Sequence, residues 1–104
     1  MDIAPKELLA LIKSGKPPVI LDVRSAPEFA SGHVPGALHF PFWSALFRAG
    51  RLGAKPSDPI VVYCGHGPRA EMATSALRLR GFSNVRFLRG HMTEWARGGL
   101  PTER

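Results

Sequence analysis

The sequence predicts an α/β protein built on a largely parallel sheet. Three observations support this prediction: short unbroken apolar runs, periodic or capped segments between them, and the regular alternation of the two. Unbroken apolar runs are typical of strands buried on both faces, and strands that alternate with helices favour a parallel sheet covered on both sides. The 104 residues contain no repeat, low-complexity tract or linker, so we expect one domain over residues 1–104.

The N-terminal third is expected to hold a helix, a strand and a second, short helix. A helix is predicted over residues 3–14, where Pro5 suits the first turn and leucines recur at helical spacing. Val-Ile-Leu-Asp-Val at residues 19–23 is the first buried strand. A short helix is then expected to begin at a cap on Ser25 and to stop at Gly32.

The rest of the chain continues the alternation. Three more strands are predicted over residues 37–40, 60–63 and 85–88, and three more helices over residues 43–49, 69–80 and 92–97. The run at 60–63, Ile-Val-Val-Tyr, is the most convincing strand of all. Glycines follow these helices, and Gly50 is expected to end the helix over residues 43–49.

Composition and charge narrow the classes of partner. The chain carries 14 Lys and Arg against 8 Asp and Glu, a net charge of +6, and such a field favours anionic partners. The basic residues form no dense run and do not interleave with aromatic residues, so no nucleic-acid partner is expected. Charged residues interrupt every apolar stretch, so we expect no membrane partner. The N-terminus does not resemble a secretory signal, so we expect a cytoplasmic location.

The chemistry is expected in the loop Cys-Gly-His-Gly-Pro-Arg at residues 64–69, between a predicted strand and a predicted helix. Cys64 is the one cysteine, so no internal disulfide forms. Gly65 and Gly67 let the backbone N–H groups turn inward as an anion nest, and the following helix N-terminus also favours negative charge. Arg69 is expected to add a fixed positive charge at the rim. These features favour a reactive thiolate, and a persulfide held in the same way, over a purely structural cysteine.

Six stretches in order along the chain form a recognisable set. They are Leu-Asp-Val-Arg at 21–24, Glu-Phe at 28–29, Gly-His-Val-Pro-Gly-Ala at 32–37, Val-Val-Tyr-Cys-Gly-His-Gly-Pro-Arg-Ala at 61–70, Leu-Arg-Gly at 88–90 and Trp95. Together they resemble the single-domain members of the rhodanese family. The resemblance implies a three-layer fold with a five-stranded, mainly parallel sheet flanked by helices. It also implies transfer of sulfane sulfur from a donor such as thiosulfate to cyanide or a thiol acceptor.

The resemblance assigns a role to each residue of the loop. Cys64 would be the catalytic nucleophile that carries the persulfide, and the substrate and anion cradle would comprise Gly65, His66, Gly67, Pro68 and Arg69. It implies no cofactor, a small anionic donor, and an acceptor that includes a protein thiol as an option. Two departures from the family pattern bear on donor preference and on the pocket wall: Gly65 stands where many members have Arg, and Gly90-His91 replaces a frequent glycine pair.

Three charged residues near the first predicted strand are expected to support the site. Asp22, Arg24 and Glu28 are interpreted as an ion-pair and capping network that fixes the loop, in preference to a catalytic role. His66 either tunes the nucleophile or contacts the acceptor, or it is an exposed loop residue. The four histidines show no ligand spacing, and Cys64 with His66 offers only two soft ligands, so no metal site is expected.

Two other functions stay open. The first is a cysteine phosphatase or arsenate reductase, but four residues separate Cys64 from Arg69, one fewer than in the cysteine-phosphatase signature. The shorter ring is expected to be too tight for a phosphate monoester, and Tyr63 stands where those phosphatases usually have His. The second is a non-catalytic rhodanese-like module that binds or regulates a partner, against which the retained cysteine, loop glycines and arginine argue.

Overall fold

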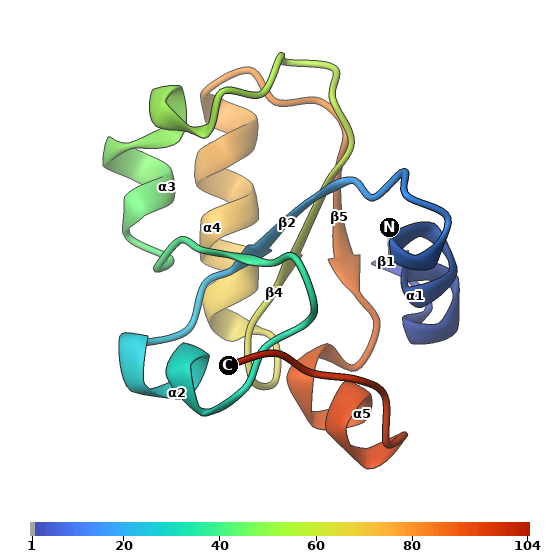
Figure 1. The fold of residues 1–104 in the computed structure, drawn as a ribbon. Helices are drawn as coiled ribbons and strands as arrows, with labels where there is room; N and C mark the ends of the chain where they lie inside the picture. The colour runs from blue at the N-terminus through green and yellow to red at the C-terminus, as the bar shows by residue number, and fades with distance from the viewer. Residues whose placement is uncertain (1) are drawn as a thin grey trace.

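A five-stranded parallel sheet forms the centre of the molecule (Figure 1). The computed structural model describes residues 2–104, and the strands lie in the order β1-β5-β4-β2-β3. Their bounds are β1 (Asp2–Ile3), β2 (Val19–Asp22), β3 (Leu38–His39), β4 (Ile60–Tyr63) and β5 (Val85–Leu88). All of the pairs are parallel. The predicted α/β architecture is therefore confirmed.

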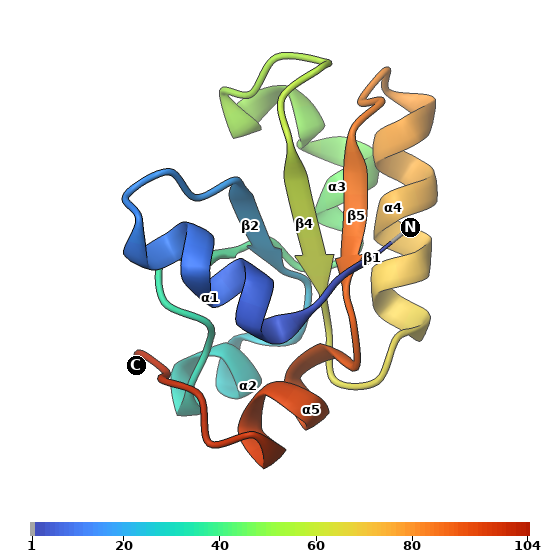
Figure 2. The same ribbon diagram turned by 90° about the vertical axis from the view of Figure 1, so that its right-hand side faces the viewer.

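Helices cover both faces of this sheet (Figure 2). They are α1 (Pro5–Lys13), α2 (Ala26–Ser31), α3 (Ser44–Phe47), the 3₁₀ turn η1 (Ala49–Leu52), α4 (Pro68–Leu79) and α5 (His91–Arg97). Along β2 and β4 the side chains alternate between two apolar cores. Leu21 and Val62 pack with α3 and α4, whereas Ile20 and Val61 pack with α1 and α5. Both strands are thus buried on both faces, as their unbroken apolar runs predicted.

The predicted helix over residues 3–14 is wrong at its start. Ile3 belongs to β1, where it pairs with Leu88, and its carbonyl accepts a hydrogen bond from the Arg89 N–H at 2.9 Å. Ile3 is fully buried, so the gain from packing against the sheet outweighs its place in a helical pattern. Pro5 then begins the helix, because its ring fixes the backbone angle that a first turn needs.

The predicted helix over residues 43–49 is also divided differently. It splits into α3 and η1, and η1 runs through Gly50 without ending there. Gly53, whose φ of 69° is left-handed, ends the segment instead. The strand predicted over residues 37–40 is shorter and comprises Leu38–His39.

A buried polar network joins the carboxyl ends of β2 and β4. The register places Asp22 beside Tyr63, and the Tyr63 hydroxyl donates to Asp22 Oδ2 at 2.7 Å while it accepts from the Val34 N–H at 3.0 Å. Arg24 Nη2 contacts the same carboxylate oxygen at 2.7 Å. Burial raises the pKa of Tyr63, so its hydroxyl stays a donor. The network holds the strand end from which Cys64 follows.

Removal of the Tyr63 hydroxyl tests how much this network contributes. Tyr63→Phe is expected to lower the free energy of unfolding by about 1–3 kcal/mol, because the Val34 N–H and the Asp22 carboxylate each lose a buried partner. Denaturant unfolding measures the loss. Ser31→Ala is the control, since it removes an exposed hydroxyl that donates to the Glu28 carbonyl, and we expect a change below about 0.5 kcal/mol. Equal small effects of both substitutions would contradict the importance of the network.

Candidate active site

The loop after β4 closes a hydrogen bond onto the cysteine. Cys64 directly follows Tyr63 of β4, and α4 begins at Pro68. Between them, the Gly67 N–H donates to Cys64 Sγ at 2.9 Å. Gly67 has a φ of 134°, a conformation that residues with a side chain rarely adopt. The glycine therefore permits the turn that brings a backbone amide onto the sulfur.

The cysteine is closed from solvent. Its exposed fraction is 0%, and it belongs to an apolar cluster that includes Val23 and Ala70, with Phe42 packed against the cluster. The thiol thus combines one amide donor with apolar surroundings.

Arg69 lies at the rim of the loop, where its charge is shared with a carboxylate. Its guanidinium donates to both oxygens of Glu28, at 2.6 and 3.1 Å, and its Nη2 lies 3.4 Å from the point where a Cβ on Gly65 would be. The Arg69 hydrogen bonds, helped by those from Ser25, lower the pKa of Glu28 to about 2 against the effect of burial. Arg69 therefore supplies a partly neutralised cation, not an isolated one, beside the loop.

The three charged residues predicted to support the site do not form a single cluster of direct contacts. Asp22 and Arg24 pair in the interior, and Arg24 Nη2 also donates to the Gly32 carbonyl at 2.8 Å. Glu28 instead forms the capping box of α2 with Ser25 and pairs with Arg69. The pair of Asp22 and Arg24 thus holds Gly32 near the end of β2. The pair of Glu28 and Arg69 connects α2 to the cysteine loop.

The other loop residues differ in exposure. His66 and Pro68 are exposed, whereas Gly65 and Gly67 are half-buried. His66 lines a hollow of about 280 Å³ between the loop, β5 and α5. Pro68 occupies the first turn of α4, where a residue without an N–H is tolerated.

The first turn of α5 forms hydrogen bonds with the cysteine loop. The Met92 N–H donates to the Cys64 carbonyl at 2.9 Å, and the Thr93 hydroxyl donates to the Gly65 carbonyl at 2.9 Å. His91 Nδ1 accepts from the Cys64 N–H at 3.2 Å. The sequence pattern singled out His91 only as a change in the pocket wall. Its contact with Cys64 is between residues 27 positions apart, and no local motif signals such a contact.

A second, smaller hollow opens beside the cysteine. It has a volume of about 120 Å³, and its lining includes Val23, Phe42, Trp43 and Arg69. Val23 and Phe42 also belong to or pack against the apolar cluster of Cys64. The lining of the larger hollow of 280 Å³ includes Phe87, which also packs against that cluster, and Gly67, whose N–H contacts the cysteine sulfur. Cys64 itself lines neither of these two hollows.

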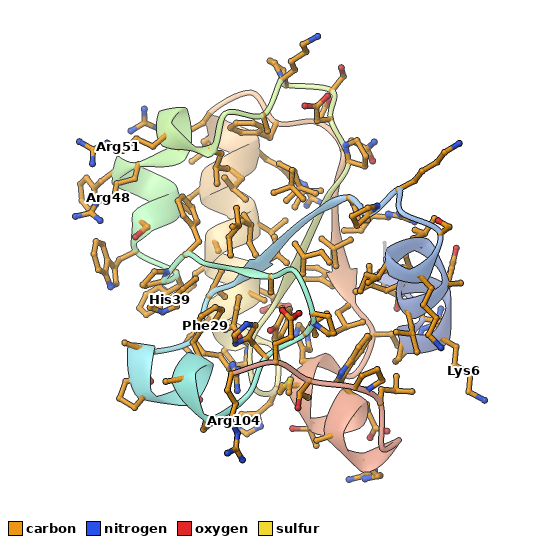
Figure 3. All side chains as sticks on the ribbon, viewed as in Figure 1. Lys6, Phe29, His39, Arg48, Arg51 and Arg104 are labelled. Atoms are coloured by element: carbon orange, nitrogen blue, oxygen red, sulfur yellow. The ribbon has the colours of Figure 1, made fainter. Side chains whose placement is uncertain are left out.

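The basic residues are spread over the molecule. Figure 3 shows Lys6, Arg48 and Arg104 on well-separated parts of the surface. Three other arginines lie in ion pairs with Glu28, Glu94 and Asp2. The net charge thus surrounds the fold and is not concentrated over one element.

Two further absences apply to the described part of the chain. Across residues 2–104, no helix combines the length and the apolar character needed to cross a bilayer. In the same residues, His, Cys, Asp and Glu side chains form no group of three or more arranged to hold a metal ion.

Comparison with known proteins identifies the family. A model of the Rhodanese-like domain matches residues 4–98. The chain is 36% identical over 84 residues to a sulfurtransferase of Allochromatium vinosum, covering 80% of this chain and 76% of the relative. It is 35% identical over 95 residues to thiosulfate sulfurtransferase 16, chloroplastic, of Arabidopsis thaliana, covering 80% and 78%. The crystal structure of the Alr3790 protein from Anabaena sp. aligns with a TM-score of 0.87 at 31% identity, covering 97% of this chain and 90% of the other.

Fold and site together define a parallel α/β domain with a cysteine-bearing loop at the carboxyl edge of its sheet. The chain belongs to the family of rhodanese-like domains. The resemblance read from the sequence motifs is thereby confirmed. The names of the relatives support sulfur transfer as the general class of activity.

The pairing of Glu28 with Arg69 predicts a stability difference that depends on pH. Because the folded-state pKa of Glu28 is about 2, below its ordinary 4.5, the pair stabilises the fold fully above about pH 4.5 and loses this effect as the pH falls towards 2. Glu28→Gln is therefore expected to be less stable than wild type at pH 6, with the gap closing in acid. Thermal unfolding of both proteins from pH 6 to pH 2 measures the gap. A gap independent of pH would contradict the assignment.

Proposed function

We propose that this protein is a rhodanese-type sulfurtransferase that carries sulfane sulfur as a persulfide on Cys64. The observation that carries the proposal is the Gly67 amide directed at the cysteine sulfur at 2.9 Å, in a loop that leads into the N-terminus of α4. An amide donor and a helix N-terminus both favour negative charge on that sulfur. A thiolate and a persulfide anion share this requirement.

Loading begins with the Cys64 thiolate as the nucleophile. The thiolate attacks the outer sulfur of thiosulfate, a new S–S bond to Cys64 forms, and the old S–S bond breaks as sulfite leaves with its electron pair. The terminal persulfide sulfur is then attacked by cyanide or an acceptor thiolate, which releases thiocyanate or a new persulfide and restores the Cys64 thiolate. Lowering the energy of the anion at each stage is the task we assign to the loop amides.

The surroundings of the sulfur support a small anionic donor. The hollow of about 120 Å³ has room for a compact anion, and Arg69 lies on its wall. The net charge of +6 attracts such an anion from a distance. Thiosulfate satisfies both conditions. Cytosolic thiols are kept reduced, which suits a free working cysteine, so we place the activity in the cytoplasm.

One observation favours an alternative, a rhodanese-like module that binds or regulates a partner without turnover. Cys64 is 0% exposed, and a buried cysteine is commonly an inert part of the core. The sulfurtransferase and the non-catalytic module differ in whether the apolar cluster around Cys64, near Val23 and Phe42, opens for a donor. A cysteine phosphatase is not favoured by any observation on the loop.

Incubation with thiosulfate tests the proposal directly. We expect intact-mass spectrometry to show an added mass of one sulfur atom on the wild-type protein, and the addition to disappear after treatment with cyanide. Cys64→Ser is the control and should gain nothing, because its hydroxyl does not form a persulfide. No sulfur on the wild type, with thiosulfate, mercaptopyruvate or a low-molecular-weight persulfide as donor, would support the non-catalytic module. Robust turnover of an aryl phosphate would revive the phosphatase.

Removal of the Arg69 charge tests the role of the rim. Arg69→Gln is expected to slow loading from thiosulfate by about three- to tenfold, because the incoming dianion loses a cation that lines the hollow. Arg97→Gln is a matched control: it removes the same net charge and also breaks an ion pair, with Glu94 on α5. The initial rate of sulfur uptake measures both. Equal slowing by the two substitutions would assign the effect to net charge and remove Arg69 from the site.

A further inference from the structure

His91 adopts a backbone conformation that glycine normally fills. Its φ is 52°, and within residues 2–104 it is the one residue other than glycine with a positive φ. Positive φ is uncommon for residues with a side chain, and such an outlier beside a candidate site motivates a search for its function. A glycine at this position would relax the backbone but would remove the ring. The contacts of the ring therefore indicate why a residue with a side chain occupies this position.

The imidazole contacts both ends of the cysteine loop. Its Nδ1 accepts the hydrogen bond of the Cys64 N–H at 3.2 Å. Its Nε2 lies 3.4 Å from the point where a Cβ on Gly67 would be. Gly67 is the residue whose own N–H donates to the Cys64 sulfur at 2.9 Å. One ring thus satisfies the first amide of the loop and packs against the residue that holds the sulfur.

We propose that His91 is a positioning residue whose neutral imidazole keeps the segment from Cys64 to Gly67 in the conformation that directs an amide at the sulfur. An effect of His91 on turnover rests on the proposed sulfur transfer. Its effect on the conformation of the loop is independent of that function. The ring does not touch the reacting atoms and acts through the backbone of the loop.

The hydrogen bond requires the neutral form of the ring. A backbone N–H donates to Nδ1, so Nδ1 carries no proton, and the proton of the neutral ring is on Nε2. In the imidazolium, Nδ1–H would face the Cys64 N–H, and two donors would oppose each other. Protonation of His91 therefore releases the first amide of the loop.

The groups around the ring determine when it protonates. Glu71 of α4 favours the protonated imidazole, whereas His66 of the loop disfavours it. Asp2 and Arg89 line the same hollow as His91, and they are paired with each other at 3.0 Å. Burial is the largest effect and lowers the pKa of His91 below its ordinary 6.5. Since the folded-state value is the lower one, the contact is complete above about pH 6.5 and is lost as the pH falls through the folded-state value.

Hydrogen exchange at the Cys64 amide, followed by NMR in the whole protein, tests the effect on the loop. His91→Asn places an amide oxygen near the position of Nδ1, tolerates positive φ and does not titrate. His91→Gly keeps the backbone and removes the acceptor. The Val62 amide of β4 serves as the internal reference for global stability.

At pH 7 we expect the protection of the Cys64 amide, relative to Val62, to fall about fivefold or more in His91→Gly and to stay near the wild-type value in His91→Asn. As the pH falls below 6.5 and through the lowered folded-state pKa of His91, the wild type should lose protection relative to His91→Asn. Equal protection in wild type and His91→Gly, or identical pH profiles of wild type and His91→Asn, would overturn the proposal.

Sulfur loading by thiosulfate from pH 8 to pH 5 then connects the loop to turnover. The intrinsic rate of loading also varies with pH, so the informative quantity is the ratio of the wild-type rate to the His91→Asn rate. We expect this ratio to fall in acid. A ratio independent of pH would overturn the role of His91 in turnover. No loading in any of the three proteins would overturn the proposed function, and amide exchange would still decide whether His91 positions the loop.

Discussion

The hydrogen bond from the Gly67 amide to the Cys64 sulfur requires a particular backbone path in a short loop. It forms because β4 ends at Tyr63, α4 begins at Pro68, and the residues between them turn through a glycine at a φ of 134°. A side chain at Gly67 would face both a strained backbone and the ring of His91. The short loop leaves few other paths between the strand and the helix. Other parts of the fold hold those two ends in place.

Support for the loop comes from two directions. In the interior, the network of Asp22, Arg24 and Tyr63 fixes the end of β4 relative to β2. On the other side, the first turn of α5 binds the Cys64 amide and carbonyl and the Gly65 carbonyl. The network is buried and has its hydrogen-bond partners, so its disruption is costly. The α5 contacts lie nearer the surface, and one of them depends on the protonation of a histidine. The buried network therefore belongs to the sheet, whereas the contact that depends on pH belongs to the helix α5.

Local and global charge have different effects at this site. The net charge of +6 is distributed widely, and at physiological ionic strength charges beyond about 8 Å are strongly screened. Arg69 is close enough to matter but shares its charge with Glu28. The Gly67 amide is not shared with a carboxylate in this way, because it donates to the Cys64 sulfur. The basic surface therefore acts mainly on the approach of an anion, and the loop acts on the anion once it has arrived.

The limits of the sequence patterns follow from the range of each interaction. The runs at β2 and β4 predicted buried strands because both faces of each strand are apolar. β1 was missed, because two residues carry no periodicity and Ile3 pairs with a strand near the other end of the chain. The glycines around Cys64 marked the loop from local chemistry alone. The partners of Arg69 and of the Cys64 amide come from segments 41 and 27 residues away, and the burial of the thiol comes from packing.

The presence of a single cysteine has a kinetic consequence. In proteins with a neighbouring thiol, an oxidised or sulfur-loaded cysteine is resolved internally through a disulfide. The 104 residues contain no second cysteine, so in the proposed reaction the sulfur on Cys64 is removed by a second molecule. In the sulfur transfer that we propose, catalysis follows a double-displacement scheme, in which the first product departs before the second reactant binds. The lifetime of the loaded protein is set by the concentration of acceptors around it.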